Sequence, residues 1–214
     1  SIGALALAAA VLATTSLVCT QAAADARKPN VIIVFVDDLG WTDLGCYGSK
    51  FYETPHIDRM AEQGAMFSRA YSSCNVCSPT RASLMTGKYP QRVGFTSYLN
   101  PNKPSGANSA ATHLPASETT IGEAFQQAGY RTGYIGKWHV GSEEVGMPKQ
   151  HGFDWQMATA KHGLPASYFF PYKWRKPSTA DVPDLEDGKP GDYLTDALTD
   201  KGIGFIKDTV SEGK

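Results

Sequence analysis

The sequence lacks a net charge of either sign that would select a partner. Its 20 Lys and Arg residues nearly balance 21 Asp and Glu residues, which leaves a formal net charge of −1 at pH 7. Without a basic field, binding to nucleic acid is not expected. Internal repeats are lacking too. Hydrophobic residues make up 42% and charged residues 19% of the 214 residues, a balance typical of a folded domain with a sizeable core rather than of a disordered chain.

Residues 1–24 lack charge altogether, and they do not begin with methionine. The apolar run 2–18 is dominated by Ala and Leu, and small alanines at 22–24 precede Asp25. We interpret residues 1–24 as a secretory signal peptide whose start is missing. A membrane-spanning helix is the rival interpretation, but the run is short and Ala-rich for a span of about 20 apolar residues. The mature part, residues 25–214, is then expected to be secreted or periplasmic, with no membrane segment.

Cysteine is scarce: beyond the predicted signal peptide only Cys46, Cys74 and Cys77 remain. An odd count in an exported protein leaves at least one thiol unpaired, ligated or modified. Two arrangements stay open at this point. Cys46 and Cys74 form a disulfide and leave Cys77 for chemistry, or these two are separate free thiols.

Strand and helix patterns alternate along the rest of the chain, which predicts an α/β fold. The β-branched run 31–36 is typical of a strand covered on both faces, as in a parallel sheet. Pro or Thr at the expected helix starts and Gly at the ends mark the helices. In chain order we expect strand 31–36, helix 54–64, strand 65–71, helix 78–87, a helix from Thr119 or Thr120 to Gly129, strand 130–138, long loops over 141–191, and a helix from Tyr193 to about Lys207.

Asp37 and Asp38 directly follow the first predicted strand, where ligand sites of open α/β sheets lie. Neighbouring strand residues point to opposite faces, so both carboxylates reach one ion only if the chain turns there, which Leu39-Gly40 permits. Carboxylate oxygens suit a hard cation, Ca²⁺ or Mg²⁺. An Asp-Asp pair alone is more often a solvated turn or a helix cap, so this interpretation depends on the motifs that follow.

The stretch Cys77-Ser78-Pro79-Thr80-Arg81 places a cysteine at a predicted helix start. The N–H groups and positive dipole end of a helix favour an anion there, and Arg81 offers a planar fork for sulfate or phosphate oxygens. An unmodified thiolate fits poorly, because carboxylates disfavour its charge and sulfur is a soft ligand for a hard cation. A cysteine-phosphatase loop is excluded because its arginine would have to stand at Ser83. A buried structural cysteine is the remaining alternative.

The next predicted strand ends in Lys137-Trp138-His139. On an extended chain Lys137 and His139 project to one face, while Trp138 projects to the other, into packing. A cation beside a titratable imidazole can bind an anionic ester and move protons. Taken alone, such a pair is more often an exposed Lys beside a surface His. Of the other histidines, His162 is a weak candidate for lining a substrate pocket, and His113 and His151 are expected in solvated loops.

Together these motifs resemble the N-terminal half of a type I sulfatase of the alkaline phosphatase-like superfamily. Cys77 to Arg81 matches the family pattern Cys-x-Pro-x-Arg, in which the cysteine is oxidised after synthesis to formylglycine, and Thr86-Gly87 follows at the family's distance. The resemblance covers most of residues 28–208 and is closest to arylsulfatase-like and N-acetylgalactosamine-6-sulfatase-like members. It implies a central mixed, mostly parallel sheet flanked by helices. The family's second pair of metal ligands has no counterpart after Tyr193, and the resemblance places residue 214 in the middle of the domain, so that sheet is expected to be incomplete here.

The resemblance also implies roles for individual residues. Asp37 and Asp38 would bind Ca²⁺, in preference to Mg²⁺, together with the formylglycine made from Cys77, which would be both nucleophile and ligand. Arg81 would hold the formylglycine hydrate, Lys137 would contact the sulfate and the nucleophile, and His139 would help to expel sulfate. A formylglycine-generating enzyme, or another sulfatase-maturing enzyme, would be a required partner.

The expected function is hydrolysis of a sulfate monoester of a small molecule, such as an aryl compound, or of a polysaccharide. Two alternatives stay open. Some relatives use the same formylglycine on phosphorus, in phosphonate monoesters or phosphodiesters, and a non-catalytic carbohydrate-binding relative would carry the motif unmodified. The aromatic segment 168–175 is suited either to stacking on sugar rings or to packing within the protein.

Overall fold

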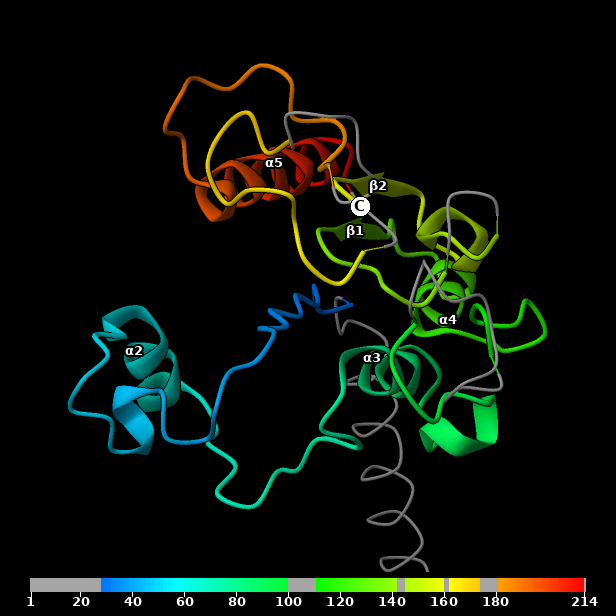
Figure 1. Cartoon of the computed structure of the whole chain (residues 1–214), viewed down its shortest axis with the longest axis horizontal. Helices are drawn as coiled ribbons and strands as arrows, with labels where there is room; N and C mark the ends of the chain where they lie inside the picture. The colour runs from blue at the N-terminus through cyan, green and yellow to red at the C-terminus, as the bar shows by residue number, and fades with distance from the viewer. Residues whose placement is uncertain (1–27, 100–110, 142–144, 160–161, 174–180, 214) are drawn as a thin grey trace, which may run out of the picture. The chain divides into compact units, whose positions relative to one another are not determined.

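The computed structural model describes residues 28–99, 111–141, 145–159, 162–173 and 181–213 (Figure 1). The predicted signal peptide, residues 1–24, therefore lies outside the described residues. Contacts divide the chain into two compact units, residues 1–63 (unit 1) and residues 64–214 (unit 2). In the part of the chain that the structure describes, no helix combines the length and the apolar character that crossing a membrane requires.

Unit 1 is organised around helix α2, Pro55–Gln63, and the short 3-10 helix η1, Gly45–Tyr47. The hydroxyl of Thr54 donates to the Asp58 carboxylate at 2.9 Å, and the same carboxylate oxygen accepts the Cys46 N–H at 2.8 Å. Asp58 lies in the first turn of α2, where its charge suits the positive end of the helix dipole. The helix predicted to begin at Thr54-Pro55 is confirmed, because local sequence supplies its start.

The two strands predicted in residues 31–36 and 65–71 do not form. Val31 to Val36 is irregular, and its side chains are 41–75% exposed. Residues 65–71 are likewise irregular and exposed. A strand exists only when its N–H and C=O groups pair with another strand, and among the described residues no strand pairs with either segment. β-Branched residues favour an extended conformation, but their presence does not reveal whether another strand lies beside the segment to pair with it.

Unit 2 contains a short parallel pair of strands, β1 (Gly133–Ile135) and β2 (Trp155–Met157), with Gly133 opposite Trp155. The strand predicted over 130–138 is thus confirmed only at its centre. β2 lies inside the stretch 141–191 that was predicted to be loops, so that prediction is wrong here. The three residues of β2 show no clear alternation of apolar and polar side chains that would predict a strand. They form a strand only because they pair with β1.

The helices of unit 2 match the sequence more closely. α4, Ile121–Gln127, begins with a capping box in which the Thr120 hydroxyl accepts the Glu123 N–H and the Glu123 carboxylate accepts the Thr120 N–H. The helices predicted over 78–87 and from Tyr193 to about Lys207 are also present near their predicted places. The remaining elements of unit 2 are α3 (Cys77–Thr86), η2 (Pro90–Val93), η3 (Pro148–His151) and α5 (Leu194–Ser211).

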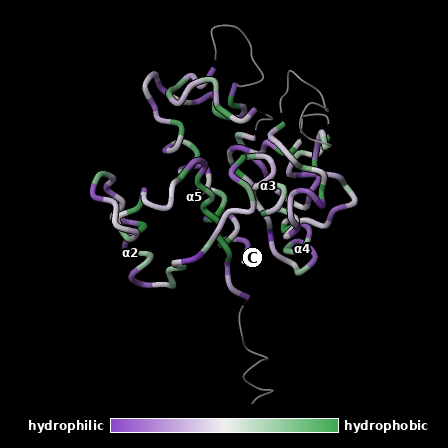
Figure 2. The backbone as a smooth tube through the Cα atoms, turned by 60° about the horizontal axis from the view of Figure 1, so that its bottom comes forward, coloured by the Kyte–Doolittle hydropathy of each residue, from purple (hydrophilic) through white to green (hydrophobic). Residues whose placement is uncertain are grey.

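Helix α5 packs on the strand pair through Phe205 (Figure 1). The Phe205 ring stacks on Trp155 with 4.8 Å between ring centroids. Its edge also lies so close to Gly133 that a Cβ there would come within 2.6 Å of it, so a larger residue at this position would require the Phe205 ring to shift. Hydrophobic and hydrophilic residues alternate along α5 (Figure 2), as expected for a helix with one packed face.

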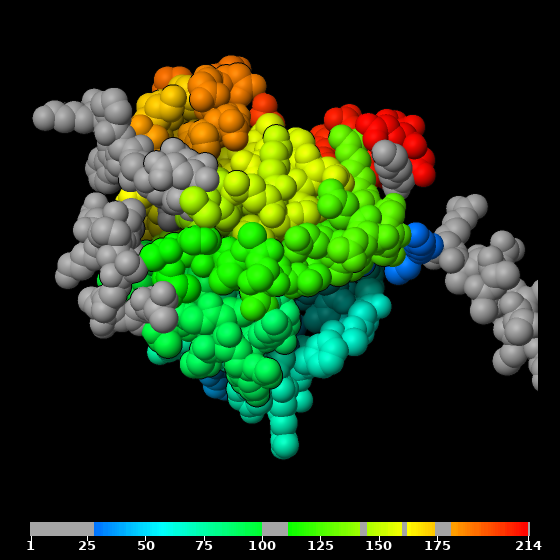
Figure 3. All heavy atoms as spheres, turned by 90° about the vertical axis from the view of Figure 1, so that its right-hand side faces the viewer, coloured from blue at the N-terminus to red at the C-terminus, as the bar shows by residue number. Residues whose placement is uncertain are grey.

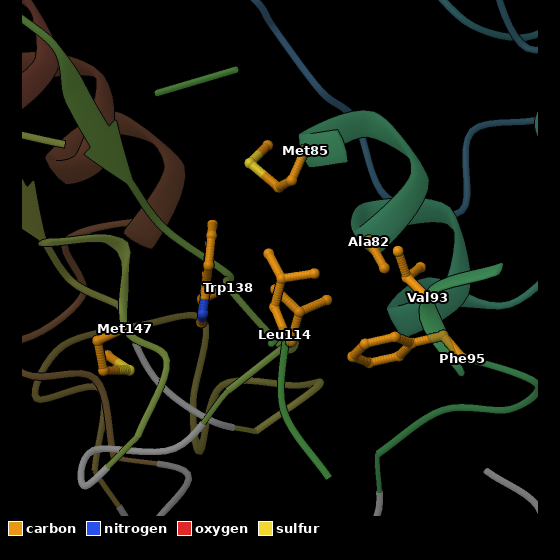
Figure 4. Packing of buried hydrophobic residues seen from close by; sticks show 8 residues of the cluster. Ala82, Met85, Val93, Phe95, Leu114, Trp138 and Met147 are labelled. Atoms are coloured by element: carbon orange, nitrogen blue, oxygen red, sulfur yellow. The ribbon is translucent and has the colours of Figure 1, made fainter. Parts of the chain in front are cut away.

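The main core of unit 2 lies between α3 and the chain that follows β1 (Figure 4). Trp138, fully buried, stands at its centre, and its indole N–H donates to the Gly146 carbonyl at 2.6 Å. The segments from α3 to β2, coloured green to yellow in Figure 3, pack into one continuous mass. The core consists of Ala82, Met85, Val93, Phe95, Leu114, Trp138, Val140 and Met147.

Candidate active site

The chain turns at Asp37 and Asp38, as the acidic pair requires if both side chains are to serve one ion. Asp38 has a left-handed backbone with φ of 58°, a conformation that Asp adopts more readily than most residues. Both residues are exposed. Just beyond them, the Asp43 carboxylate accepts the Gly40 N–H at 2.8 Å and closes the next turn. Unit 1 thus presents two adjacent carboxylates on a sharply turned loop.

Cys77 is the first residue of α3, whereas the sequence predicted Ser78 as the cap and Cys77 just outside the helix. Val76, with an extended backbone, is the N-cap, and it offers no side-chain cap to the first N–H groups. Those N–H groups and the helix dipole therefore stay available to an anion beside residue 77. Gly87, with φ of 67°, ends the helix as predicted. Cys77 itself is half-buried and a free thiol.

The loop before Cys77 is fastened to the first turn of α3. The hydroxyls of Ser72 and Thr80 both donate to the Cys74 carbonyl, each at 2.6 Å, and lie 3.2 Å from each other. The Thr80 N–H also donates to the Val76 carbonyl at 3.2 Å. These contacts hold the residues that lead into Cys77, so its position does not depend on the helix alone.

Arg81 is buried and joins α3 to the end of β1. Its Nη1 donates to the Lys137 carbonyl at 2.5 Å and to the Tyr134 hydroxyl at 3.2 Å. The Tyr134 hydroxyl in turn donates to the same carbonyl at 2.5 Å. One turn after Cys77, a permanent positive charge is therefore held against the segment that carries Lys137 and His139.

The segment 137–139 is not extended, so the argument that placed Lys137 and His139 on one face is wrong. Gly136 has φ of 88° and His139 has φ of 56°, which bends the backbone on both sides of Trp138. Lys137 is half-buried and His139 is 3% exposed, so neither is a surface residue. A left-handed histidine is uncommon and strained, and such residues gather at functional sites. The prediction that Trp138 packs inward is confirmed.

A second connection between α3 and His139 runs through the backbone of Leu99. The Ser78 hydroxyl accepts the Leu99 N–H at 3.0 Å, and the Leu99 carbonyl lies 2.9 Å from His139 Nε2. A carbonyl oxygen only accepts hydrogen bonds, so Nε2 carries the hydrogen. In the neutral ring, Nδ1 then holds the lone pair and is the nitrogen able to take up a proton.

Gly163 lies directly against the His139 ring. A Cβ at this glycine would come within 2.7 Å of Cε1 and 3.1 Å of Nδ1. The neighbouring residue is His162, the weak pocket candidate, which is half-buried. The structure thus brings the 162–163 segment to His139, although no contact of the His162 side chain supports its proposed role.

Two further predictions are settled by the positions of the side chains. Cys46 and Cys74 are free thiols, which decides between the two arrangements left open. Burial raises the pKa of the Cys46 thiol, and the hydrogen bond to Asp58 and the charge of Asp58 raise it further. His151 was expected in a solvated loop, but it is 1% exposed and packs beside Trp138 with 5.9 Å between ring centroids. Burial lowers the pKa of His151, and the nearby His113 lowers it too.

The contribution of Ser78, Leu99, Tyr134 and Gly163 was missed by sequence reasoning. Ser78 stands at a variable position of the motif, and Leu99 takes part only through its backbone, so neither carries a composition signal. Tyr134 is distant in sequence from Arg81, and Gly163 is distant from His139. Among the described residues, no group of three or more His, Cys, Asp or Glu side chains gathers as a metal cage.

Comparison with known proteins gives a consistent result. The family model described as Sulfatase matches residues 29–214. The chain is 39% identical over 148 residues to the N-acetylgalactosamine-6-sulfatase of Homo sapiens, an alignment that covers 68% of this chain and 27% of that protein. The chain therefore spans about a quarter of the length of this curated relative.

Two solved structures share the fold. Ps i-CgsB is 34% identical with a TM-score of 0.69, covering 86% of this chain and 42% of that one, and it has also been solved with k-i-k-neocarrahexaose. BT4656, solved with its substrate D-glucosamine-2-N,6-O-disulfate, is 31% identical with a TM-score of 0.62, covering 85% of this chain and 31% of that one. The expected α/β architecture, here a small parallel sheet with helices, is confirmed as that of these proteins.

Proposed function

The chain belongs to the sulfatase family, and we propose from this premise that the protein hydrolyses sulfate esters with a formylglycine made from Cys77 as its nucleophile. One observation carries the proposal: two hydrogen-bonded connections join α3 to the 137–139 segment, one through Arg81 and one through Leu99. Through them, the segment that carries Lys137 and His139 is tied to Ser78, the neighbour of Cys77, and to Arg81, one turn along the helix. Family membership alone would leave that arrangement unexplained.

The proposal assigns a distinct task to Cys77, Arg81, Lys137 and His139. Addition of water to the aldehyde at position 77 gives a hydrate with two hydroxyls. One hydroxyl attacks sulfur as the S–O bond to the alcohol breaks, and the proton that this hydroxyl loses is balanced by the one that the departing alcohol oxygen takes up. The helix N–H groups, Arg81 and Lys137 stabilise the negative charge of the sulfate oxygens. His139 Nδ1 then takes the proton of the second hydroxyl as the C–O bond to sulfate breaks, which releases sulfate and restores the aldehyde.

We propose Ca²⁺ as the cofactor, held in part by Asp37 and Asp38. Two carboxylates on one turned loop are the hard oxygen ligands that Ca²⁺ prefers. Because Ca²⁺ takes six to eight oxygens, these two can supply only part of its shell. When bound, the ion would contribute positive charge at the sulfate. Calorimetric titration with Ca²⁺ should show binding to the intact gene product that Asp38→Asn weakens, and equal affinity in both would contradict this assignment.

The substrate class that we propose is a sulfated carbohydrate. Support comes from the relatives: one is an N-acetylgalactosamine-6-sulfatase, and another was solved with a disulfated glucosamine. In the aromatic segment 168–175, the rings of Tyr168 and Phe169 are about half exposed, as a sugar-stacking surface requires. We also propose that residues 1–24 direct secretion and that residues 25–214 form the N-terminal part of the catalytic domain.

The test is to produce the intact gene product in a host that contains a sulfatase-maturing enzyme. Mass spectrometry of the peptide with Cys77 should show conversion of the thiol to an aldehyde, and sulfated monosaccharides and aryl sulfates should be hydrolysed. The matched control is Cys77→Ala, whose methyl side chain cannot be converted to the aldehyde in such a host. An unmodified thiol together with no hydrolysis would leave a non-catalytic binding protein as the better account. Faster turnover of aryl phosphonates than of sulfates would point to phosphorus chemistry instead.

A further inference from the structure

Ser78 uses its hydroxyl in an unusual way for a residue in the first turn of a helix. A serine at the N-cap commonly accepts a hydrogen bond from an N–H of its own helix, but the N-cap of α3 is Val76 and Ser78 is the second residue inside the helix. In α3 the Ser78 hydroxyl instead accepts the N–H of Leu99, 21 residues along the chain, at 3.0 Å. Ser78 is fully buried, so this is a bond made in the interior and not a surface contact. The hydroxyl therefore holds a distant backbone rather than its own helix.

What Leu99 holds in turn is the ring of His139. Its carbonyl accepts the hydrogen of His139 Nε2 at 2.9 Å. If the hydrogen moved to Nδ1, the lone pair of Nε2 would face the lone pairs of the carbonyl, so the position of this carbonyl selects the tautomer. The left-handed backbone of His139 and its 3% exposure limit other orientations of the ring.

We infer that Ser78 is a positioning residue for His139. Through the backbone of Leu99 it holds the imidazole in the tautomer with hydrogen on Nε2 and keeps Nδ1 free of hydrogen for proton transfer. This inference rests on the proposed function, in which His139 Nδ1 takes a proton from the group at position 77. It adds that Ser78, the residue next to the nucleophile, and His139 are both bonded to the backbone of Leu99. The nucleophile and the histidine are therefore positioned together.

The experiment compares Ser78→Ala with Ser83→Ala in the intact, matured gene product. Both variants remove one hydroxyl from α3, and the hydroxyl of Ser78 is the one that accepts the Leu99 N–H. The ¹⁵N signals of the His139 ring, identified by their loss in His139→Gln, report which nitrogen carries the hydrogen. We expect the wild type and Ser83→Ala to show hydrogen on Nε2, and Ser78→Ala to show a mixture of tautomers.

Kinetics supply the second readout. General acid–base catalysis contributes roughly 10²–10⁴-fold, so partial loss of the correct tautomer should lower kcat of Ser78→Ala about tenfold while KM changes less than about twofold. Mass spectrometry of each variant must show complete conversion of Cys77, so that a lower rate does not report poor maturation. Ser83→Ala should keep the wild-type kcat.

Two results would overturn the inference. The first is hydrogen on Nδ1 of His139 in the wild type, which needs no variant and so does not depend on Ser78→Ala folding. The second is an unchanged single tautomer with unchanged kcat in Ser78→Ala. If the matured wild type hydrolyses no sulfate ester, the proposed function fails, whereas the ring signals still decide whether Ser78 controls His139.

Discussion

Gly163→Ala adds one methyl group beside the His139 ring and should lower both kcat and the stability of the fold. The new Cβ would stand 2.7 Å from Cε1, whereas ordinary contacts of a Cβ begin at 3.4 Å. The ring or the 163 backbone must therefore move by about 0.7 Å. The ring has little freedom to yield, because its Nε2 is bonded to the Leu99 carbonyl and its backbone is left-handed.

Two magnitudes follow from that displacement. A misplacement of about 1 Å of a catalytic group can lower the rate about 10²-fold, so we expect kcat to fall roughly 10- to 100-fold. Overpacking by one methyl should lower the free energy of unfolding by about 1–3 kcal/mol. The assays are hydrolysis of an aryl sulfate by the matured protein and urea denaturation of the same preparation.

Gly204→Ala is the matched control. Gly204 lies inside α5, and a Cβ built there has no atom within 4 Å. The same methyl should therefore raise the free energy of unfolding by about 0.5–1 kcal/mol and leave kcat unchanged. A Gly163→Ala protein with wild-type kcat would refute the reasoning that the 163 backbone confines the imidazole.

Three further predictions can be checked separately. Cys77→Ala should abolish sulfate ester hydrolysis while leaving the circular dichroism spectrum unchanged, and retained turnover would exclude residue 77 as the nucleophile. Thr120→Ala removes the acceptor of the Glu123 N–H and the donor to the His151 carbonyl, so urea denaturation should show a loss of about 1–2 kcal/mol. Burial lowers the pKa of His151 in the folded state below 6.5, so the unfolded state takes up more protons below about pH 6.5 and stability should fall there. His151→Leu should weaken that acid dependence in denaturation measured from about pH 5 to pH 8, and an unchanged slope would contradict it.

Helices were predictable wherever their ends are encoded locally. The Thr120 capping box, Pro55 at the start of α2 and the left-handed Gly87 at the end of α3 all act within a few residues of their own position. Strands were not predictable in the same way. Val31 to Val36 has strand composition but forms no strand pairing among the described residues, whereas Trp155–Met157 has little strand signal and pairs with β1. Pairing is non-local, so composition cannot report it.

The residue types of the candidate site were readable from the sequence, but their relations were not. The Asp37-Asp38 pair, the Cys77–Arg81 pattern and the Lys137/His139 pair stood out as chemistry-bearing residues at suggestive places. The argument for the last pair assumed an extended chain, and the left-handed backbone of His139 overturns that geometry. The burial of His151 was missed for the same reason, since a loop sequence says nothing about what packs over it.

The sequence by itself determined the identities of the reactive side chains, the capped helices and, through the Cys77–Arg81 motif, the family to which the chain belongs. Only the tertiary structure decided that Arg81 bonds the Lys137 carbonyl and that Ser78 reaches His139 through Leu99. The physical reason is the distance along the sequence between the interacting atoms. Caps and turns are set by atoms a few residues apart, whereas the orientation of an imidazole depends on carbonyls and glycines brought to it by the packing of distant segments.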